Sequence, residues 1–268
     1  RYYHDIKHIE EMLRQLTYKR HELDTKTYWS MALAIIFHDV VLENSTHNTA
    51  EKLSEQYARE HLTEHSSFYT KYYDFDLDLV SSLILTTSPE KYSEYRTNVE
   101  KLMIYFDLHR FCNKNQKSYH LQILHENQKT PIDSFVNKRG SILKEVKQSC
   151  EKMNKISFFN LTFDEIISGI DNSVTVLENL TFKIGVYPGS FHPLHKGHKD
   201  IINQAEKVFD KIIIVQAQNP EKEEPIKLIT EYEVINAKSD EYIGNIFKSL
   251  DTDKCELSMI RGLRNSSD

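Results

Sequence analysis

The sequence predicts two structural domains of different class, an all-helical one followed by an α/β one with a parallel, doubly wound sheet. Two observations support this. Residues 1–180 show helical periodicities and hold only two of the chain's seven glycines, Gly140 and Gly169. Along 183–215, an apolar run, a turn rich in glycine and histidine, a helical pattern and a second apolar run follow one another. We therefore predict domains at 1–180 and 181–268.

The composition is typical of a globular protein with a proper core: 268 residues, of which 39% are hydrophobic and 28% charged. The formal net charge of −6 gives no indication of nucleic-acid or membrane partners, and no apolar run reaches the ~18 residues of a membrane span. Cys112, Cys150 and Cys255 form no CxxC pair, so we expect reduced thiols and a cytoplasmic protein.

Helices are predicted along the first domain wherever apolar residues return every three or four positions. They are expected at 5–16, 28–42, 49–62, 76–87, 97–111, 134–153 and 163–179, with another around Tyr119–Leu124. In the second domain, strands are expected at 184–187 and 211–215. The apolar face of the helix between them is predicted to hold Ile201, Ile202, Ala205, Val208 and Phe209.

Histidines and aspartates recur on the predicted helices in a pattern typical of a metal site. His4 and His8 stand one helical turn apart, so both can project from one face. His38 and Asp39 directly follow an apolar run, where an unpaired charge would be costly. Asp107 lies in a later apolar helix and could close the same site. Imidazole and carboxylate suit a divalent transition ion. The alternative is that His38 and Asp39 only cap a helix or form an ion pair.

This pattern resembles the HD-domain metal-dependent phosphohydrolases, in particular a small helical branch with an Arg-x-Tyr-His-x-x-x-His start and a Phe-His-Asp pair. The resemblance is clear over about residues 1–110. It implies an HD-like fold and a divalent ion of the Mn, Mg, Fe, Zn or Ni type that activates water for attack on a phosphate ester. That branch usually has a histidine after a Leu-Ile-x-x-Thr segment, which 83–89 lacks, and this favours metal binding over efficient hydrolysis. The implied ligands are His8 or His4, His38, Asp39 and Asp107.

The turn that opens the second domain carries a phosphate-binding pattern. From Gly189 to His198 it reads Gly-Ser-Phe-His-Pro-Leu-His-Lys-Gly-His and leads into a helix. Helix N-termini at such turns bind phosphate, because free backbone N–H groups and the helix dipole face the anion. Gly189 permits close approach of the backbone, and His195 and His198 can donate hydrogen bonds to phosphate oxygens. The alternative, that these loop histidines are incidental, does not explain four motif positions in register.

This stretch resembles the nucleotidyltransferase signature of the HIGH superfamily, and phosphopantetheine adenylyltransferase more than the nicotinamide-nucleotide enzymes. Tyr-Pro-Gly-Ser-Phe at 187–191, Asn-Pro-Glu-Lys at 219–222 and Ile-Arg-Gly-Leu-Arg at 260–264 carry the likeness. It implies a Rossmann-like, HUP-type domain that transfers an adenylyl group from ATP, with Mg²⁺, to 4′-phosphopantetheine in coenzyme A biosynthesis. The implied ATP- and substrate-binding residues are Gly189, Ser190, Phe191, His195, His198, Lys222, Arg261, Gly262 and Arg264. Of these, His198, Lys222 and Arg261 would be catalytic.

The resemblance also assigns individual roles. Ser190 would hold the acceptor phosphate, and His198 would stabilise the pentavalent transition state. Lys222 would bridge the acceptor and donor phosphates, while Arg261 and Arg264 would bind ATP phosphates or ribose.

Two other functions stay open: a nicotinamide mononucleotide adenylyltransferase of NAD synthesis, and a nucleotide-binding regulatory module with degenerate sites. The expected partners are ATP and a small phosphorylated acceptor, without nucleic acid or membrane. The chain stops soon after Arg264, so we expect the second domain to be truncated at its C-terminus. A homo-oligomer also stays open, since that family commonly forms hexamers and the added helical domain could block that packing.

Overall fold

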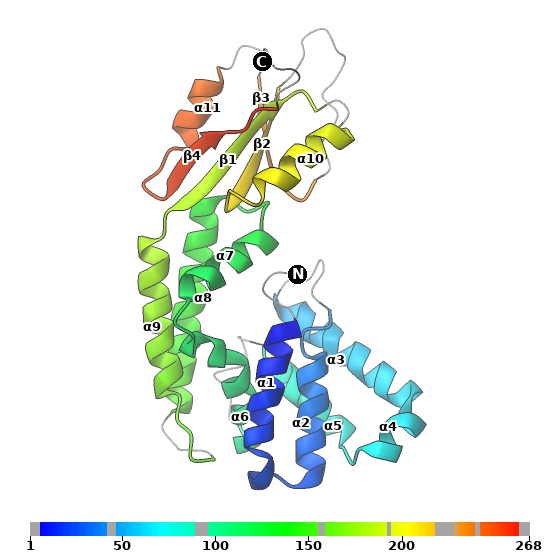
Figure 1. Ribbon diagram of the computed structural model, residues 1–268. Helices are drawn as coiled ribbons and strands as arrows, with labels where there is room; N and C mark the ends of the chain where they lie inside the picture. The colour runs from blue at the N-terminus through cyan, green and yellow to red at the C-terminus, as the bar shows by residue number, and fades with distance from the viewer. Residues whose placement is uncertain are drawn as a thin grey trace. The chain divides into compact units, whose positions relative to one another are not determined.

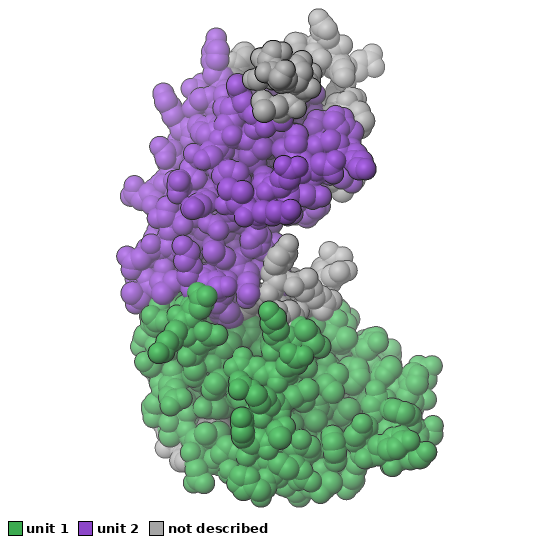
Figure 2. Space-filling model, viewed as in Figure 1, with its two compact units in different colours: residues 1, 3–116, 140–174 green, residues 2, 117–139, 175–268 purple. Residues whose placement is uncertain are grey.

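The structure is a computed structural model. It describes residues 6–41, 47–88, 96–154, 159–191, 194–217, 228, 230–238 and 242–262. The chain divides into two compact units, which Figure 2 shows in different colours: residues 1, 3–116 and 140–174, and residues 2, 117–139 and 175–268. Residues 117–139 thus group with the α/β unit, which differs from a division at residue 180.

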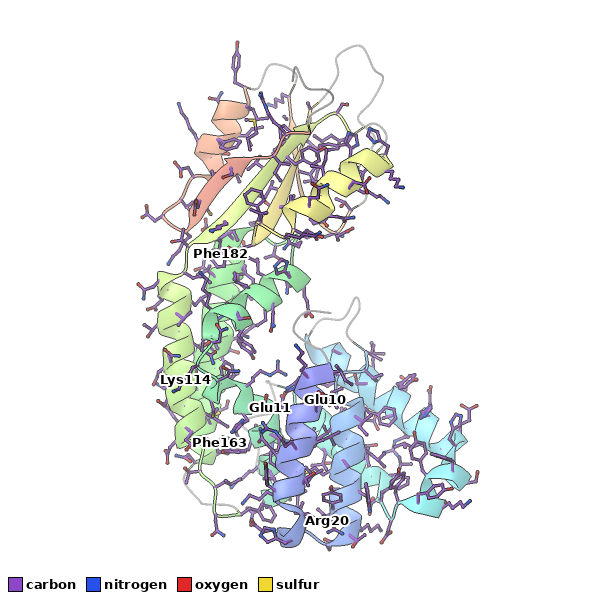
Figure 3. All side chains as sticks on the ribbon, in the orientation of Figure 1. Glu10, Glu11, Arg20, Lys114, Phe163 and Phe182 are labelled. Carbon is purple, nitrogen blue, oxygen red and sulfur yellow. The ribbon has the colours of Figure 1, made fainter. Side chains whose placement is uncertain are left out.

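Helices are the regular elements of the first unit in its described residues (Figure 1). They are α1 (Ile6–Tyr18), the short 3₁₀ helix η1 (Arg20–Glu22), α2 (Thr25–Phe37), α3 (His47–Glu64), α4 (Ser66–Tyr72), α5 (Leu77–Thr86), α6 (Asn98–Leu108) and the 3₁₀ helix η3 (His109–Cys112). Two longer helices, α8 (Ile132–Met153) and α9 (Asp164–Asn179), contribute residues to both units. Phe163, labelled in Figure 3, is fully buried just before α9 and packs edge-on against Tyr105 of α6.

Helix α2 is bounded by local hydrogen bonds that position the residues after it. At its start, Asp24 Oδ1 accepts the backbone N–H of Thr27 at 2.9 Å. The helix ends at Phe37 and does not run to residue 42 as predicted. The reason is that Val41 N–H donates to the Ser54 side chain at 3.1 Å and does not continue the helical ladder. His38 is therefore the C-cap, and its side chain leaves the end of the helix.

A parallel sheet of four strands forms the centre of the second unit. Its strands are β1 (Phe182–Gly189), β2 (Lys211–Ala217), β3 (Glu233–Ala237) and β4 (Cys255–Met259). They stand in the order β3-β2-β1-β4, and all neighbours are parallel. The order reverses between β1 and β4, which makes this the switch point where open α/β sheets bind ligands. The arrangement confirms the predicted parallel sheet and fits a Rossmann-like domain.

Helices α10 (Lys196–Ala205) and α11 (Ile243–Leu250) flank the sheet, and α7 (Gln116–Glu126) and the start of α8 lie at its foot (Figure 1). On one face, Ile202 of α10 packs with Ile212 and Ile214 of β2. Val208, predicted on this apolar face, is 64% exposed because α10 ends at Ala205 and the chain turns.

A buried lysine ties the turn between α7 and α8 to the foot of the sheet. Lys211, whose side chain is fully buried, donates hydrogen bonds from Nζ to the carbonyls of Gln128 and Thr130. Its third partner is Glu233 Oε2, at 3.1 Å. The Gln128 side chain in turn accepts the backbone N–H of Ile212 at 3.1 Å. These contacts explain why residues 117–139 group with the α/β unit.

The three cysteines are free of disulfides, in agreement with the prediction of reduced thiols. Burial raises the pKa of the Cys150 thiol to about 12, so this side chain stays protonated at neutral pH. In the part of the chain that the structure describes, none of the helices combines the length and apolarity needed to cross a membrane.

Candidate functional site

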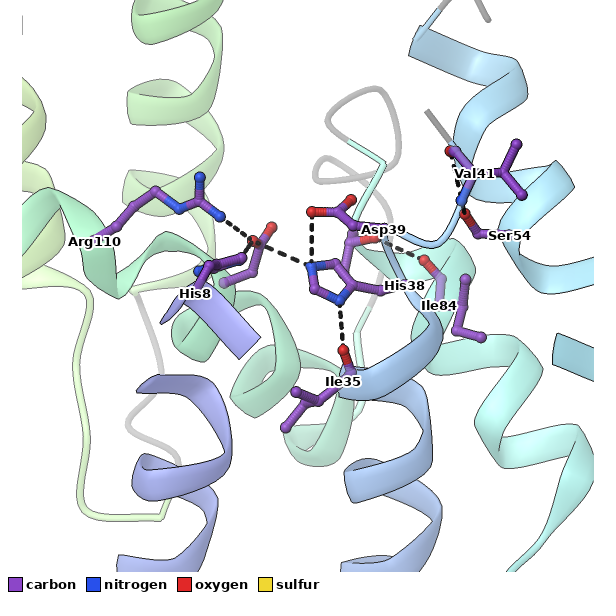
Figure 4. A network of polar contacts seen from close by, with 10 residues as sticks. His8, Ile35, His38, Asp39, Val41, Ser54, Ile84 and Arg110 are labelled. Carbon is purple, nitrogen blue, oxygen red and sulfur yellow. Dashed lines mark hydrogen bonds and ion pairs between the residues drawn. The ribbon is translucent and has the colours of Figure 1, made fainter. Parts of the chain in front are cut away.

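Four predicted ligands of the first unit meet in one cluster (Figure 4). His8 comes from α1, His38 and Asp39 from the end of α2, and Asp107 from α6. His8 Nε2 lies 3.0 Å from Asp107 Oδ1, and His38 Nε2 lies 3.1 Å from Asp39 Oδ2 and 3.9 Å from Asp107 Oδ1. One ligand atom from each of His8, His38 and Asp39 lies within 4.8 Å of the others. His4, the alternative to His8, falls outside the described residues.

The orientation of His38 suits a metal ligand. Its Nδ1 donates to the backbone carbonyl of Ile35 at 2.8 Å, which directs Nε2 at the cluster. This Nε2 is buried, and within the described residues it makes no hydrogen bond of acceptable geometry. A carbonyl behind the ring is the usual partner of metal-ligating histidines. Two imidazoles and two carboxylates therefore fit a divalent transition ion.

The charges of the cluster favour a bound cation. Burial opposes a charge on His38, but the carboxylate of Asp39 outweighs it and raises the pKa of His38 to about 9. Burial would also raise the pKa of Asp107, yet the hydrogen bond from His8 and the charge of Arg110 hold that pKa below its usual range. Without an ion, a proton on His38 and the charge of Arg110 offset the charges of the two carboxylates. A divalent ion would take its place.

Arg110 belongs to this cluster but was not among the residues predicted from the sequence. Its Nη2 lies 3.6 Å from Asp107 Oδ1, and its side chain is 11% exposed. A signal was present, because residues three apart on a helical segment share a face.

The turn after β1 has a backbone that depends on glycine. Phe191 adopts a left-handed φ of +44° and is buried, so its ring packs beneath the turn. A Cβ on Gly189 would lie 2.9 Å from Phe191 Cζ, which is closer than real contacts allow. Ser190, between them, is exposed. The strained residue of this turn is therefore Phe191, which packing holds in place. Strained non-glycine residues of this kind are common at binding sites.

The two histidines of the motif stand at the N-terminus of α10. His195 is the N-cap, and His198 is the third residue of the helix. Their rings are stacked, with centroids 3.7 Å apart and planes at 20°. The backbone N–H of His195 donates to His198 Nδ1 at 3.4 Å, so a neutral His198 carries its hydrogen on Nε2. Both rings lie where the helix dipole favours an anion.

The end of β4 reaches the same edge of the sheet. Ile260 N–H donates to Val186 O at 2.8 Å, so the chain leaves β4 beside β1. Arg261 and Gly262 follow and are exposed. A Cβ on Gly262 would lie 2.5 Å from Ile201 Cδ1 of α10, so this position is packed against the motif helix. The structure thus brings to one edge Gly189, Ser190, Phe191, His195, His198, Arg261 and Gly262. Lys222 and Arg264 fall outside the described residues.

Residues 186–254 match the family model for cytidylyltransferase-like proteins. The chain is also similar to curated phosphopantetheine adenylyltransferases. That of Fusobacterium nucleatum subsp. nucleatum is 38% identical over 94 residues, or 32% of this chain and 57% of that protein. That of Geotalea daltonii is 40% identical over 97 residues, or 33% of this chain and 60% of that protein. That of Cytophaga hutchinsonii is 37% identical over 93 residues, or 32% of this chain and 62% of that protein. No solved structure matches the chain.

The chain spans about three fifths of the length of the curated relatives it matches. The family match begins inside β1 and ends just before β4, so it covers the β1–α10 turn. This supports the nucleotidyltransferase character of the α/β unit. The likeness of the helical unit to HD proteins lies outside that match and stays a proposal.

Proposed function

We propose that the α/β unit transfers an adenylyl group from ATP, with Mg²⁺, to 4′-phosphopantetheine, giving dephospho-CoA and pyrophosphate. The observation that carries the proposal is the stacked pair His195–His198 at the N-terminus of α10, at the edge of the sheet where β1 and β4 end. The similarity to phosphopantetheine adenylyltransferases supports the choice of acceptor.

In this reaction an oxygen of the acceptor phosphate attacks the α-phosphorus of ATP. The bond from that phosphorus to the bridging oxygen of the β-phosphate breaks, and pyrophosphate leaves. No side chain has to act as a nucleophile, so the protein positions the reactants and offsets charge. His198, donating from Nε2, would stabilise the pentavalent transition state. His195 and the first N–H groups of α10 would bind the triphosphate, and the exposed Ser190 would hold the acceptor phosphate.

Positively charged side chains would complete this phosphate-binding site. Arg261 lies two residues after the end of β4, at the same edge of the sheet, where it would bind phosphate or ribose. Lys222 and Arg264 have their roles in the proposal from the sequence motifs alone.

The acceptor is tested by incubating the purified protein with Mg²⁺, ATP and one acceptor at a time. We expect pyrophosphate release with 4′-phosphopantetheine and none with nicotinamide mononucleotide or without acceptor. Release with the mononucleotide alone would make the protein an enzyme of NAD synthesis. Calorimetric binding of ATP without release from either mixture would favour a regulatory module.

We further propose that residues 1–180 form a metal-dependent phosphohydrolase of the HD type, and that the transferase lies in 181–268. The cluster of two imidazoles and two carboxylates favours this second function. The ligands would be His8, His38, Asp39 and Asp107. When bound, a divalent ion lowers the pKa of a water molecule and offsets charge on a phosphate ester. Titration with Mn²⁺ followed by calorimetry tests the site, and we expect about one ion per cluster.

A further inference from the structure

A pocket of about 170 Å³ lies in the α/β unit, on the face of the sheet opposite to α10. Ile212 and Ile214 of β2 pack with α10, so the alternating side chain of Ile213 points to the other face. The pocket lies at the starts of the strands, where Glu233 opens β3 and Cys255 opens β4. It is therefore separate from the turn after β1, which the proposed transferase uses.

Apolar side chains from four elements line this pocket. Ile184 of β1 and Ile213 of β2 line it from the sheet. Ile132, the first residue of α8, and Leu250, the last residue of α11, line it from the helices. Apolar walls offer water few hydrogen-bond partners, so an apolar group that displaces this water gains free energy.

Carboxylates give the pocket its charge. Glu233 Oε2 pairs with Lys211 Nζ at 3.1 Å, so the charge of Glu233 is offset. Asp133 lies in the first turn of α8 and forms no ion pair in the described part of the chain. The dipole at the start of this helix offsets a part of its charge. None of the described residues that line the pocket is basic, so the charge of Asp133 is left for a ligand.

The thiol of Cys255 reports the charge inside the pocket. Burial raises its pKa, and a hydrogen bond from Thr252 acts in the opposite direction. The carboxylates of Asp133, Asp251 and Glu233 raise this pKa further. The charge around the thiol is thus negative, which favours a cation in the pocket over an anion.

We propose that this pocket binds a small organic cation, an ammonium group on a short alkyl chain. The ammonium group would donate a hydrogen bond to the Asp133 carboxylate, and the chain would pack against Ile184, Ile213 and Leu250. A Mg²⁺ or Ca²⁺ ion fits less well, because it needs several oxygen ligands that apolar walls do not supply. The proposal is independent of both proposed enzymatic activities.

The test is a titration of the full chain, followed by NMR of isotope-labelled isoleucine methyl groups. The methyl groups of Ile132, Ile184 and Ile213 line the pocket. Ile202, which packs on the opposite face, and Ile35, in the other unit, are internal references. The probes are n-butylammonium, n-butanol and butyrate at constant pH and ionic strength. We expect saturable shifts of the three pocket methyl groups, with a Kd for n-butylammonium at least about threefold below that for n-butanol. Butyrate should bind most weakly.

Three variants locate the binding. Asp133→Asn should raise the Kd for n-butylammonium by at least about threefold and leave that for n-butanol unchanged. Glu256→Gln is the matched control, because Glu256 is exposed and follows Cys255 in β4, so its side chain points to the other face. Ser249→Leu adds volume at the end of α11, where Ser249 lines the pocket, and should abolish the binding of all three probes.

The results separate a cation site from an apolar hollow. Equal Kd values for n-butylammonium and n-butanol, or equal effects of Asp133→Asn and Glu256→Gln, would overturn the assignment to a cation. Shifts that do not saturate, or that are as large at Ile202 as in the pocket, would overturn the site itself. Should Asp133→Asn fail to fold, the order of the three probes in the wild type and the result for Ser249→Leu decide.

Discussion

His8 Nε2 lies 3.0 Å from Asp107 Oδ1, although the two residues stand 99 positions apart in the chain. Helices α1 and α6 pack against each other and bring the side chains together. The contact needs a hydrogen or a cation between nitrogen and oxygen. Burial, and then the charge of Arg110, lower the pKa of His8 and so disfavour a second proton on this ring. We propose that this contact belongs to a site that accepts a positive ion.

Replacing one carboxylate of this cluster should weaken ion binding. In Asp39→Asn the negative charge is lost and a neutral amide replaces the carboxylate, so the affinity for Mn²⁺ should fall by about a hundredfold. Titration calorimetry measures this directly. Asp78→Asn is a matched control, because the Asp78 side chain is 89% exposed and pairs with Arg59 outside the cluster. Equal Mn²⁺ affinity in wild type and Asp39→Asn would show that the cluster is only an ion-pair network.

Removing the imidazole of His198 should affect chemistry and leave stability almost unchanged. The residue lies at a helix N-terminus and is only half-buried, so His198→Ala should leave the melting temperature close to that of the wild type. The loss of a donor to the transition state should lower kcat for pyrophosphate release by about 10²–10³-fold. His21→Ala serves as a control, since that side chain is 78% exposed in the other unit. A variant with wild-type kcat would remove His198 from the mechanism.

Substitution of glycine by alanine should change the free energy of unfolding in opposite directions at Gly185 and Gly140. A Cβ on Gly185 would lie 2.6 Å from Ile260 Cδ1 and 2.7 Å from Phe209 Cδ2, so Gly185→Ala should destabilise by about 1–3 kcal/mol. Gly140 lies inside α8 with nothing within 4 Å of such a Cβ, so Gly140→Ala should stabilise by up to ~1 kcal/mol. Urea unfolding midpoints test both. Equal shifts would contradict the packing described around β1.

Replacing the buried Lys211 alone should lower the free energy of unfolding. In Lys211→Met the carbonyls of Gln128 and Thr130 lose their donor and Glu233 loses its cation, so unfolding should become easier by about 3 kcal/mol. Burial lowers the pKa of Lys211 despite the nearby carboxylate, which shows that the charge itself is held at a cost. The double variant with Glu233→Leu should therefore recover much of the lost stability. A double variant less stable than Lys211→Met alone would refute this.

The parts predictable from the sequence were those set by local patterns. The apolar runs around Val186 and Ile213 predicted the strands, and the parallel pairing of these two residues confirms the sheet. The end of α2 could not be predicted, because Ser54, far along the chain, binds the N–H of Val41. The link between Lys211 and Gln128 spans 83 positions and has no local signature. The spacing of Arg110 three residues after Asp107 was a local signal, but the place of both beside His8 depends on the packing of α6 against α1.

The most direct measurement of the central claim, two independent sites in one chain, is a single-turnover experiment with ATP labelled at the α-phosphorus. Label should pass into dephospho-CoA at the same rate in wild type and Asp39→Asn when 4′-phosphopantetheine and Mg²⁺ are present. His198→Ala should transfer it at least about a hundredfold more slowly. Transfer lost in Asp39→Asn but kept in His198→Ala would contradict the account, as would a wild type that binds ATP and transfers no label.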